Sequence, residues 1–272
     1  MENEIAASEQ AQICRTRAGY YQFLARLFYE ELTDEFIDQF IESQTVLPLD
    51  PATSESERAF AQGTNRMVKY LTRRTPDTLA HTRCDFARIF LGAGSVTKVP
   101  VSPFESVYAN EGRLIMQGSR DAACALYAAE GLEVEDSYNM PEDHISFEFQ
   151  YLALLLNRQA SALDTAESAP TSQEQTEASA LADAYEVRSR AFFEDHVAPW
   201  VPLFCEEARS LAETMFYQGL LQATGAWVAL ECALLGLDGL AAQTEVRALA
   251  ADAHAKAEGR DTLLHGSARE VA

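Results

Sequence analysis

The chain has 272 residues, enough for one large domain or two modest ones, and 47% of them are hydrophobic, which supplies a substantial core. It carries 42 acidic against 21 basic residues, a formal net charge of −21 at pH 7. Because neutralising phosphates requires clustered Lys and Arg, this charge argues against a nucleic-acid-binding protein. An acidic surface favours basic partners, although the charge is equally consistent with a surface that only maintains solubility.

The cysteines and the N-terminal residues are typical of a cytoplasmic protein. Five cysteines, an odd number with no C-x-x-C pair, suit a reducing compartment better than a disulfide framework. Residues 1–12 lack the basic start and the apolar core of a secretory signal. The most apolar stretch, 219–237, is interrupted by Gln222, Gly225 and Glu231, which predicts a buried helix rather than a membrane span.

Apolar residues recur every three or four positions along most of the chain, which predicts amphipathic helices. In the N-terminal half, the predicted helices run from Ile13 to Phe28, from Thr33 or Asp34 to Ile41, from about Ser54 to Leu71, from Pro76 to Leu91, where Gly92 to Gly94 ends it, and from Ser119 to Glu130, with Gly131 after its last turn.

The C-terminal half continues this pattern. A helix is expected to begin at Pro141 and run through Leu156, and another to carry Leu181 through Phe193. Between them, residues 164–177 are rich in Ser, Thr, Ala, Glu and Gln and contain Pro170, which predicts an exposed, mobile connection. After a turn at 196–200 we expect two long helices to about Leu237, then an alanine-rich tail.

No convincing run of alternating β-branched residues occurs, apart from a short piece at 95–101. We therefore predict an all-α fold, a single irregular bundle of about ten helices. Its expected parts are an N-terminal helical part at 1–163, a flexible linker or hinge at 164–177, a C-terminal part of the same domain at 178–238, and a tail at 239–272.

Two clusters of polar and aromatic residues hold the candidate functional groups. One begins at Pro103 and contains Glu105, Ser106 and Tyr108, and the other begins at Pro141 and contains Asp143, His144 and Glu148. Each proline is expected at a helix entrance, where unpaired backbone N–H groups and the positive end of the helix dipole favour anions and carbonyl groups.

The chemistry of these clusters is open to two readings. A carboxylate beside an imidazole, as in Asp143 and His144, is the raw material of general acid–base catalysis. No nucleophile elbow, phosphate loop, H-E-x-x-H or dinucleotide motif accompanies it, however. His81 with Cys84 and Asp85 lacks the second ligand pair of a metal site, so we expect no metal or cofactor. The other reading is structural: capping groups and a buried hydrogen-bond network involving Glu105, Tyr108 and His144.

Taken together, these residues resemble the TorD/DmsD family of cytoplasmic chaperones that serve molybdenum enzymes of the dimethyl sulfoxide reductase type. The resemblance covers about residues 13–235. The segments that carry it are the aromatic first helix at 20–28, the helix end at 90–92, the Pro-aromatic-Glu-Ser-x-Tyr segment at 103–108, the Pro-x-Asp-His segment at 141–144, and Phe192-Phe193-x-x-His196 with Trp200. Phe104 stands where the family commonly has tyrosine, and Met140 where it often has glutamate.

The resemblance implies a binding protein without enzymatic activity. It would hold the twin-arginine signal peptide and the apo-catalytic subunit of a molybdenum reductase until the cofactor is inserted. A twin-arginine signal peptide has an Arg-Arg pair beside an apolar segment, so its receptor needs acidic groups beside an apolar groove. In this hypothesis Asp143 and Glu148 contact the arginines, His144 holds Asp143, and the groove is lined by Tyr21, Phe86 and Phe90. The full set of expected peptide-binding residues is Tyr21, Phe86, Phe90, Gly92, Pro103, Glu105, Ser106, Tyr108, Pro141, Asp143, His144 and Glu148.

Two other functions stay open: a weak guanine-nucleotide-binding or hydrolysing protein, and a structural assembly subunit of a reductase complex. The family also includes domain-swapped dimers, for which the 164–177 connection would serve as the hinge.

Overall fold

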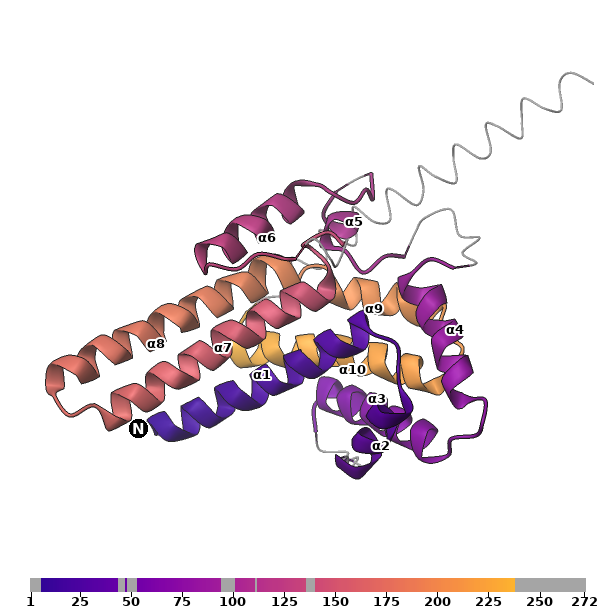
Figure 1. Ribbon diagram of the computed structural model, residues 1–272, viewed down its shortest axis with the longest axis horizontal. Coiled ribbons are helices and arrows are strands. Elements are labelled where there is room, and N and C mark those ends of the chain that lie inside the picture. Colours follow the sequence, from indigo (N-terminus) through magenta and orange to yellow (C-terminus); the bar gives the residue numbers. More distant parts are fainter. Residues whose placement is uncertain are drawn as a thin grey trace, which may run out of the picture.

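The fold is built almost entirely from helices, as the apolar spacing predicts. The computed structural model describes residues 6–43, 47, 53–93, 101–110, 112–135 and 140–237. Across these ranges the helices are α1 (Ala7–Tyr29), α2 (Asp34–Ser43), α3 (Glu55–Thr72), α4 (Thr78–Phe90), α5 (Glu105–Ala109), α6 (Gly118–Ala129), α7 (Ile145–Ser168), α8 (Ser172–Phe192), a π-helical turn (Phe193–Val197), α9 (Val201–Arg209) and α10 (Met215–Leu235) (Figure 1).

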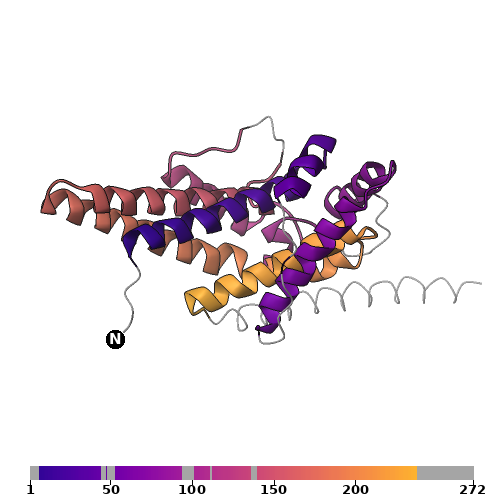
Figure 2. The ribbon, with the colours of Figure 1, turned by 90° about the horizontal axis from the view of Figure 1, so that it is seen from below.

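Three helix pairs form the body of the bundle. Helix α1 packs along α7, and α7 forms an antiparallel hairpin with α8 (Figure 1). On the other side, α3 crosses α10, as Figure 2 shows. The crossing is close because Gly63 and Gly219 meet there: a Cβ added to Gly63 would lie 2.6 Å from the carbonyl oxygen of Gly219. Bulkier residues at this crossing would separate the two helices.

Aromatic rings join the helices in the core. Phe28 of α1 contacts Phe90 of α4 and Phe149 of α7, with ring centroids 5.5 and 6.0 Å apart. The Phe28 and Phe90 rings also reach Phe204 of α9. Edge and tilted ring contacts of this kind add about 0.5–1.5 kcal/mol each to area burial. The predicted aromatic face of the first helix is thus confirmed as core.

Several helix ends follow the local sequence signals. Gly92 has φ +68° after α4, and Gly131 has φ +73° after α6, the left-handed conformation that glycine adopts without a steric penalty. At both ends the N–H one residue beyond the glycine bonds a carbonyl of the last turn. Both glycines therefore end their helices as predicted.

Other boundaries differ from the prediction. Helix α1 begins at Ala7 instead of Ile13, and α9 is short. Pro76 precedes α4, which begins at Thr78. Of the piece expected at 95–101, only residue 101 is among the described residues, and the tail expected at 239–272 lies outside them.

The 164–177 segment is exposed along most of its length, but it is mostly helical. Helix α7 continues to Ser168 and α8 begins at Ser172, so only residues 169–171 connect them. The Thr171 hydroxyl accepts the N–H of Glu174 and caps α8. A hinge in this segment stays a prediction.

Candidate functional site

The two polar clusters fold into one unit. The N–H of Ile145 donates to the carbonyl of Pro103 at 2.9 Å, and the N–H of Glu105 donates to the carbonyl of Asp143 at 3.0 Å. These bonds form a single antiparallel bridge between Phe104 and His144. Each cluster lies at a helix start, as expected, but α5 begins at Glu105 and α7 at Ile145, so both prolines lie before the helices.

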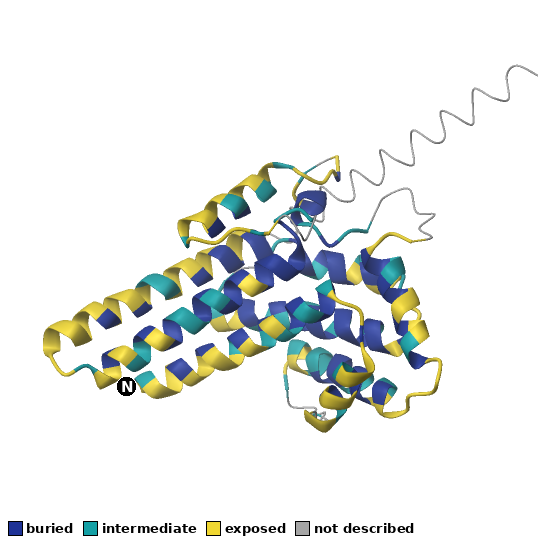
Figure 3. Ribbon diagram, in the orientation of Figure 1, coloured by how far each residue is buried: buried dark blue, intermediate teal, exposed yellow. Residues whose placement is uncertain are grey.

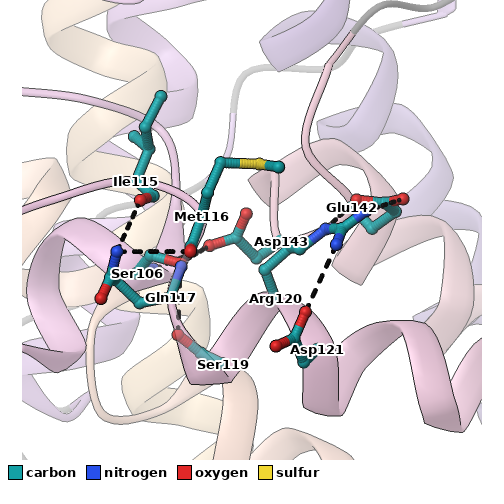
Figure 4. A network of polar contacts seen from close by, with 9 residues as sticks. All are labelled: Ser106, Ile115, Met116, Gln117, Ser119, Arg120, Asp121, Glu142 and Asp143. Carbon is teal, nitrogen blue, oxygen red and sulfur yellow. Dashed lines mark hydrogen bonds and ion pairs between the residues drawn. The ribbon is translucent and has the colours of Figure 1, made fainter.

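Asp143 caps the helix of the other cluster. Its Oδ2 accepts the N–H of Ser106 at 2.8 Å and a short hydrogen bond from the Ser106 hydroxyl (Figure 4). The Ser106 hydroxyl in turn accepts the N–H of Gln117 at 3.2 Å. The side chain of Asp143 is fully buried. In this conformation the Asp143 carboxylate is already engaged by Ser106 and closed to solvent, so a contact between Asp143 and peptide arginines stays a prediction.

The neighbouring Glu142 is the accessible carboxylate of the pair. It forms a two-pronged ion pair with Arg120 of α6, at 2.6 and 2.8 Å (Figure 4). This pair lowers the pKa of Glu142. Two adjacent acidic residues thus have different roles, since one joins the clusters in the interior and the other ties α6 to them at the surface.

His144 is a neutral, buried ring rather than a partner of Asp143. Its Nδ1 accepts the N–H of Ser146 at 3.2 Å and caps α7. The rings of Phe104 and Phe147 pack against it, with centroids 5.1 and 5.9 Å away. Burial lowers the pKa of His144 to about 3. In this conformation Ser106 rather than His144 bonds Asp143, and a role of His144 in peptide binding stays a prediction.

Glu105 and Glu148 form a second buried group beneath the clusters. Glu105 pairs with Nδ1 of His196 at 2.9 Å, and the indole N–H of Trp200 donates to Glu148 at 3.2 Å. Burial, with the charges of Glu105 and Asp143, raises the pKa of Glu148 well above its usual range. Glu148 therefore favours the protonated form. Like Asp143, it does not meet a peptide arginine in this conformation.

Tyr108 closes the unit on the side of α9. Its ring stacks on Trp200 with centroids 5.5 Å apart, and its hydroxyl donates to Glu207 at 3.3 Å. The guanidinium of Arg113 lies 4.7 Å from the Tyr108 ring centroid and forms a two-pronged ion pair with Glu207. The buried hydrogen-bond network weighed from the sequence is confirmed for Glu105 and Tyr108, with α9 and the π-helical turn as partners.

The three aromatic rings predicted to line a groove belong to the core, whereas the predicted Gly92 is exposed. Tyr21, Phe86 and Phe90 are all buried, and the Tyr21 hydroxyl donates to Glu231 of α10. Figure 3 shows the start of α7 as buried, and α5 as buried apart from its exposed last residue, Ala109. A groove lined by these three rings is therefore absent from the part of the chain that the structure describes.

The clusters have no arrangement for catalysis by a metal or an exposed nucleophile. Within the described ranges, no group of three or more His, Cys, Asp or Glu side chains is arranged to hold a metal ion. Ser106 is fully buried, with its hydroxyl bonded to Asp143. The unit joins helices α5 and α7 through buried side chains.

Comparisons with known proteins agree with this geometry. Residues 54–206 match the family described as "Nitrate reductase delta subunit", more than half of the chain and both clusters. A protein named "Chaperone protein TorD" from Vibrio cholerae is 29% identical over 197 residues, covering 70% of this chain and 78% of the relative. The proteins of the same name from Vibrio vulnificus and Photobacterium profundum are 24% and 25% identical and cover 79% and 86% of this chain.

The chain belongs to the TorD/DmsD family. The family and these relatives are chaperones, not enzymes, and the chain is a chaperone of this family. Among the helices in the described ranges, none is both long and apolar enough to cross a bilayer.

Three residues that complete the unit were not among the predicted site residues: His196, Glu207 and Arg113. His196 and Glu207 stand far from the clusters along the chain, whereas Arg113 follows Tyr108 by five residues. The signal for His196 was present in the Phe-Phe-x-x-His pattern, where a π-helical turn directs it to Glu105. No sequence pattern indicates that Arg113 pairs with Glu207, because the sequence does not show whether a charged side chain forms an exposed or a buried salt bridge.

Proposed function

We propose that this TorD/DmsD-family chaperone holds the twin-arginine leader, and with it the apo-catalytic subunit, of a molybdenum reductase of the dimethyl sulfoxide reductase type. It works in the cytoplasm and delays export until the molybdopterin cofactor is inserted. The observation that carries this proposal is the match of this sequence to the family and to proteins named as TorD chaperones. In the structure the residues of the two clusters bond to one another and to His196 in the interior.

The acidic surface supports the same function. The chain has twice as many acidic as basic residues, which attracts a peptide with an arginine pair. Such long-range attraction speeds encounter and weakens as salt shortens the Debye length from about 10 Å at 0.1 M to about 3 Å at 1 M. The on-rate for a leader should therefore fall as salt rises.

The test is fluorescence anisotropy with labelled synthetic leaders of the molybdenum reductases from the same host. Each leader is compared with a control in which Lys-Lys replaces Arg-Arg. We expect micromolar or tighter binding to one leader and at least tenfold weaker binding to its control, since Arg binds carboxylates in a two-pronged geometry that Lys lacks. Binding to no leader, or equal binding to the controls, would overturn the proposal.

A further inference from the structure

An open pocket of about 630 Å³ lies beside the second cluster. Its walls come from the C-terminal half of α1, residues 132–135 after α6, and α7. This volume is within the usual range for pockets that enclose a small ligand. The pocket therefore has room for a few side chains of a peptide, but not for a whole leader.

The floor of this α1–α7 pocket is apolar. Tyr29 of α1 and Leu154 of α7 are partly exposed in it, and the largely buried rings of Phe147 and Tyr151 line the same pocket. Gln150 and Asn157 lie beside them and carry amide groups that can hydrogen-bond a peptide backbone. Partly exposed aromatic rings with a few polar groups are typical of a recognition surface.

The rim of the pocket is acidic. Glu30, Glu133 and Glu135 line it, and Arg26 is its basic residue. The Arg26 guanidinium is already engaged by the Glu30 carboxylate at 2.8 Å and by the carbonyls of Glu30 and Glu31 at 3.1 Å. Three acidic side chains against one basic side chain give the pocket lining an excess of negative charge, and Glu133 and Glu135 are exposed. This charge complements a basic ligand with an apolar part.

The pocket is continuous with the signature residues of the family. Phe147 in its floor packs on His144, and Tyr29 packs on Phe147, with ring centroids 5.9 and 6.1 Å apart. Tyr127 in its wall donates its hydroxyl to the carbonyl of Glu142 at 3.2 Å. The joined clusters therefore support the pocket from behind, although the carboxylates of Glu105, Asp143 and Glu148 are closed to solvent.

We propose that the α1–α7 pocket binds the start of the leader's apolar segment, with the arginine pair at the Glu133 and Glu135 rim. This site rests on the proposed function and replaces the buried Asp143 and Glu148 as the contact for the arginines. Apolar side chains cover Tyr29 and Leu154, and the arginines gain carboxylate partners at the pocket edge.

Two pairs of variants test the site by anisotropy with the labelled leader that wild-type protein binds. Leu154→Glu places a charge in the floor, and its control, Leu181→Glu, changes an exposed leucine of α8 in the same way. Glu133→Lys reverses a rim charge, and its control, Glu167→Lys, reverses an exposed charge near the end of α7. Circular dichroism confirms that each variant folds.

We expect both pocket variants to bind the leader about tenfold more weakly, a loss of roughly 1.4 kcal/mol, and both controls to bind it as wild type does. A photo-crosslinker at Gln150 should also capture the leader, whereas one at Thr165 should not. If wild type binds a leader and the pocket variants and crosslinks match their controls, the pocket is wrong while the chaperone function stands. If wild type binds no leader, both proposals are overturned.

Discussion

Replacing Asp143 with alanine should destabilise the protein far more than replacing its neighbour Glu142. Asp143→Ala removes the acceptor of the Ser106 N–H and hydroxyl in a fully buried position. A hydrogen bond to a charged group contributes about 1.5–3 kcal/mol, and the stranded N–H costs about 1–3 kcal/mol. The expected loss in the free energy of unfolding is therefore about 3–5 kcal/mol. Glu142→Ala removes a partly exposed ion pair with Arg120, worth about 0–1 kcal/mol.

The assay is urea unfolding of both variants, followed by circular dichroism, with the midpoint and slope fitted for each. The midpoint should fall clearly for Asp143→Ala and hardly at all for Glu142→Ala. The two variants also separate structure from recognition, because a folded Asp143→Asn variant should retain leader binding. Equal, small shifts for both alanine variants would refute the assignment of Asp143 as the buried joint between the clusters.

Three further predictions concern packing and pH. Gly63→Ala should lower the free energy of unfolding by about 1–3 kcal/mol, because its Cβ would lie 2.6 Å from backbone atoms of α10. Gly19→Ala in α1 meets no atom within 4 Å and should stabilise the protein by up to about 1 kcal/mol. Thermal melts that rank the two variants the other way would contradict the close crossing. Burial lowers the pKa of His144 to about 3, so below about pH 6.5 the unfolded chain takes up a proton that the folded chain does not. The free energy of unfolding should therefore fall between pH 6.5 and 3, and it should fall less steeply in His144→Asn. Identical slopes of the free energy of unfolding against pH in the two proteins would argue against the buried neutral ring. Burial raises the pKa of Glu148, so the protonated side chain contributes to the free energy of unfolding below its ordinary pKa near 4.3, and this contribution is lost as pH rises. Glu148→Gln should remove this pH-dependent loss, and the variant should be at least as stable as wild type at pH 7. A large destabilisation of the variant at pH 7 would show that the ionised form of Glu148 is the native one.

Much of the helical framework was readable from the sequence because apolar spacing reports directly which face of a helix is buried. Gly92 and Gly131 were read correctly, since a left-handed residue after a helix is a local requirement. The composition of the 164–177 segment resembles a linker and predicts a mobile connection, whereas the segment is mostly helical. The Thr171-x-x-Glu174 pattern, a capping signal, was present and predicts the start of α8.

The site was predicted less completely because its key contacts are long-range. Sequence reasoning selected Ser106, Asp143 and Glu105, but it could not show that Asp143 bonds to Ser106 rather than to a ligand. Burial decided that outcome, and burial depends on how α5 and α7 meet. The α1–α7 pocket was invisible for the same reason, since Glu133 and Leu154 come together only through the packing of α7 against the segment after α6.

The central claim, that the leader is what the chaperone holds, is tested most directly with the client itself. The affinity of the purified chaperone for a full-length apo-reductase of the host should be compared with its affinity for the same enzyme lacking its leader. We expect a stable complex with the full-length client and at least tenfold weaker binding without the leader. Equal binding of both forms would contradict the claim and would place recognition on the body of the enzyme.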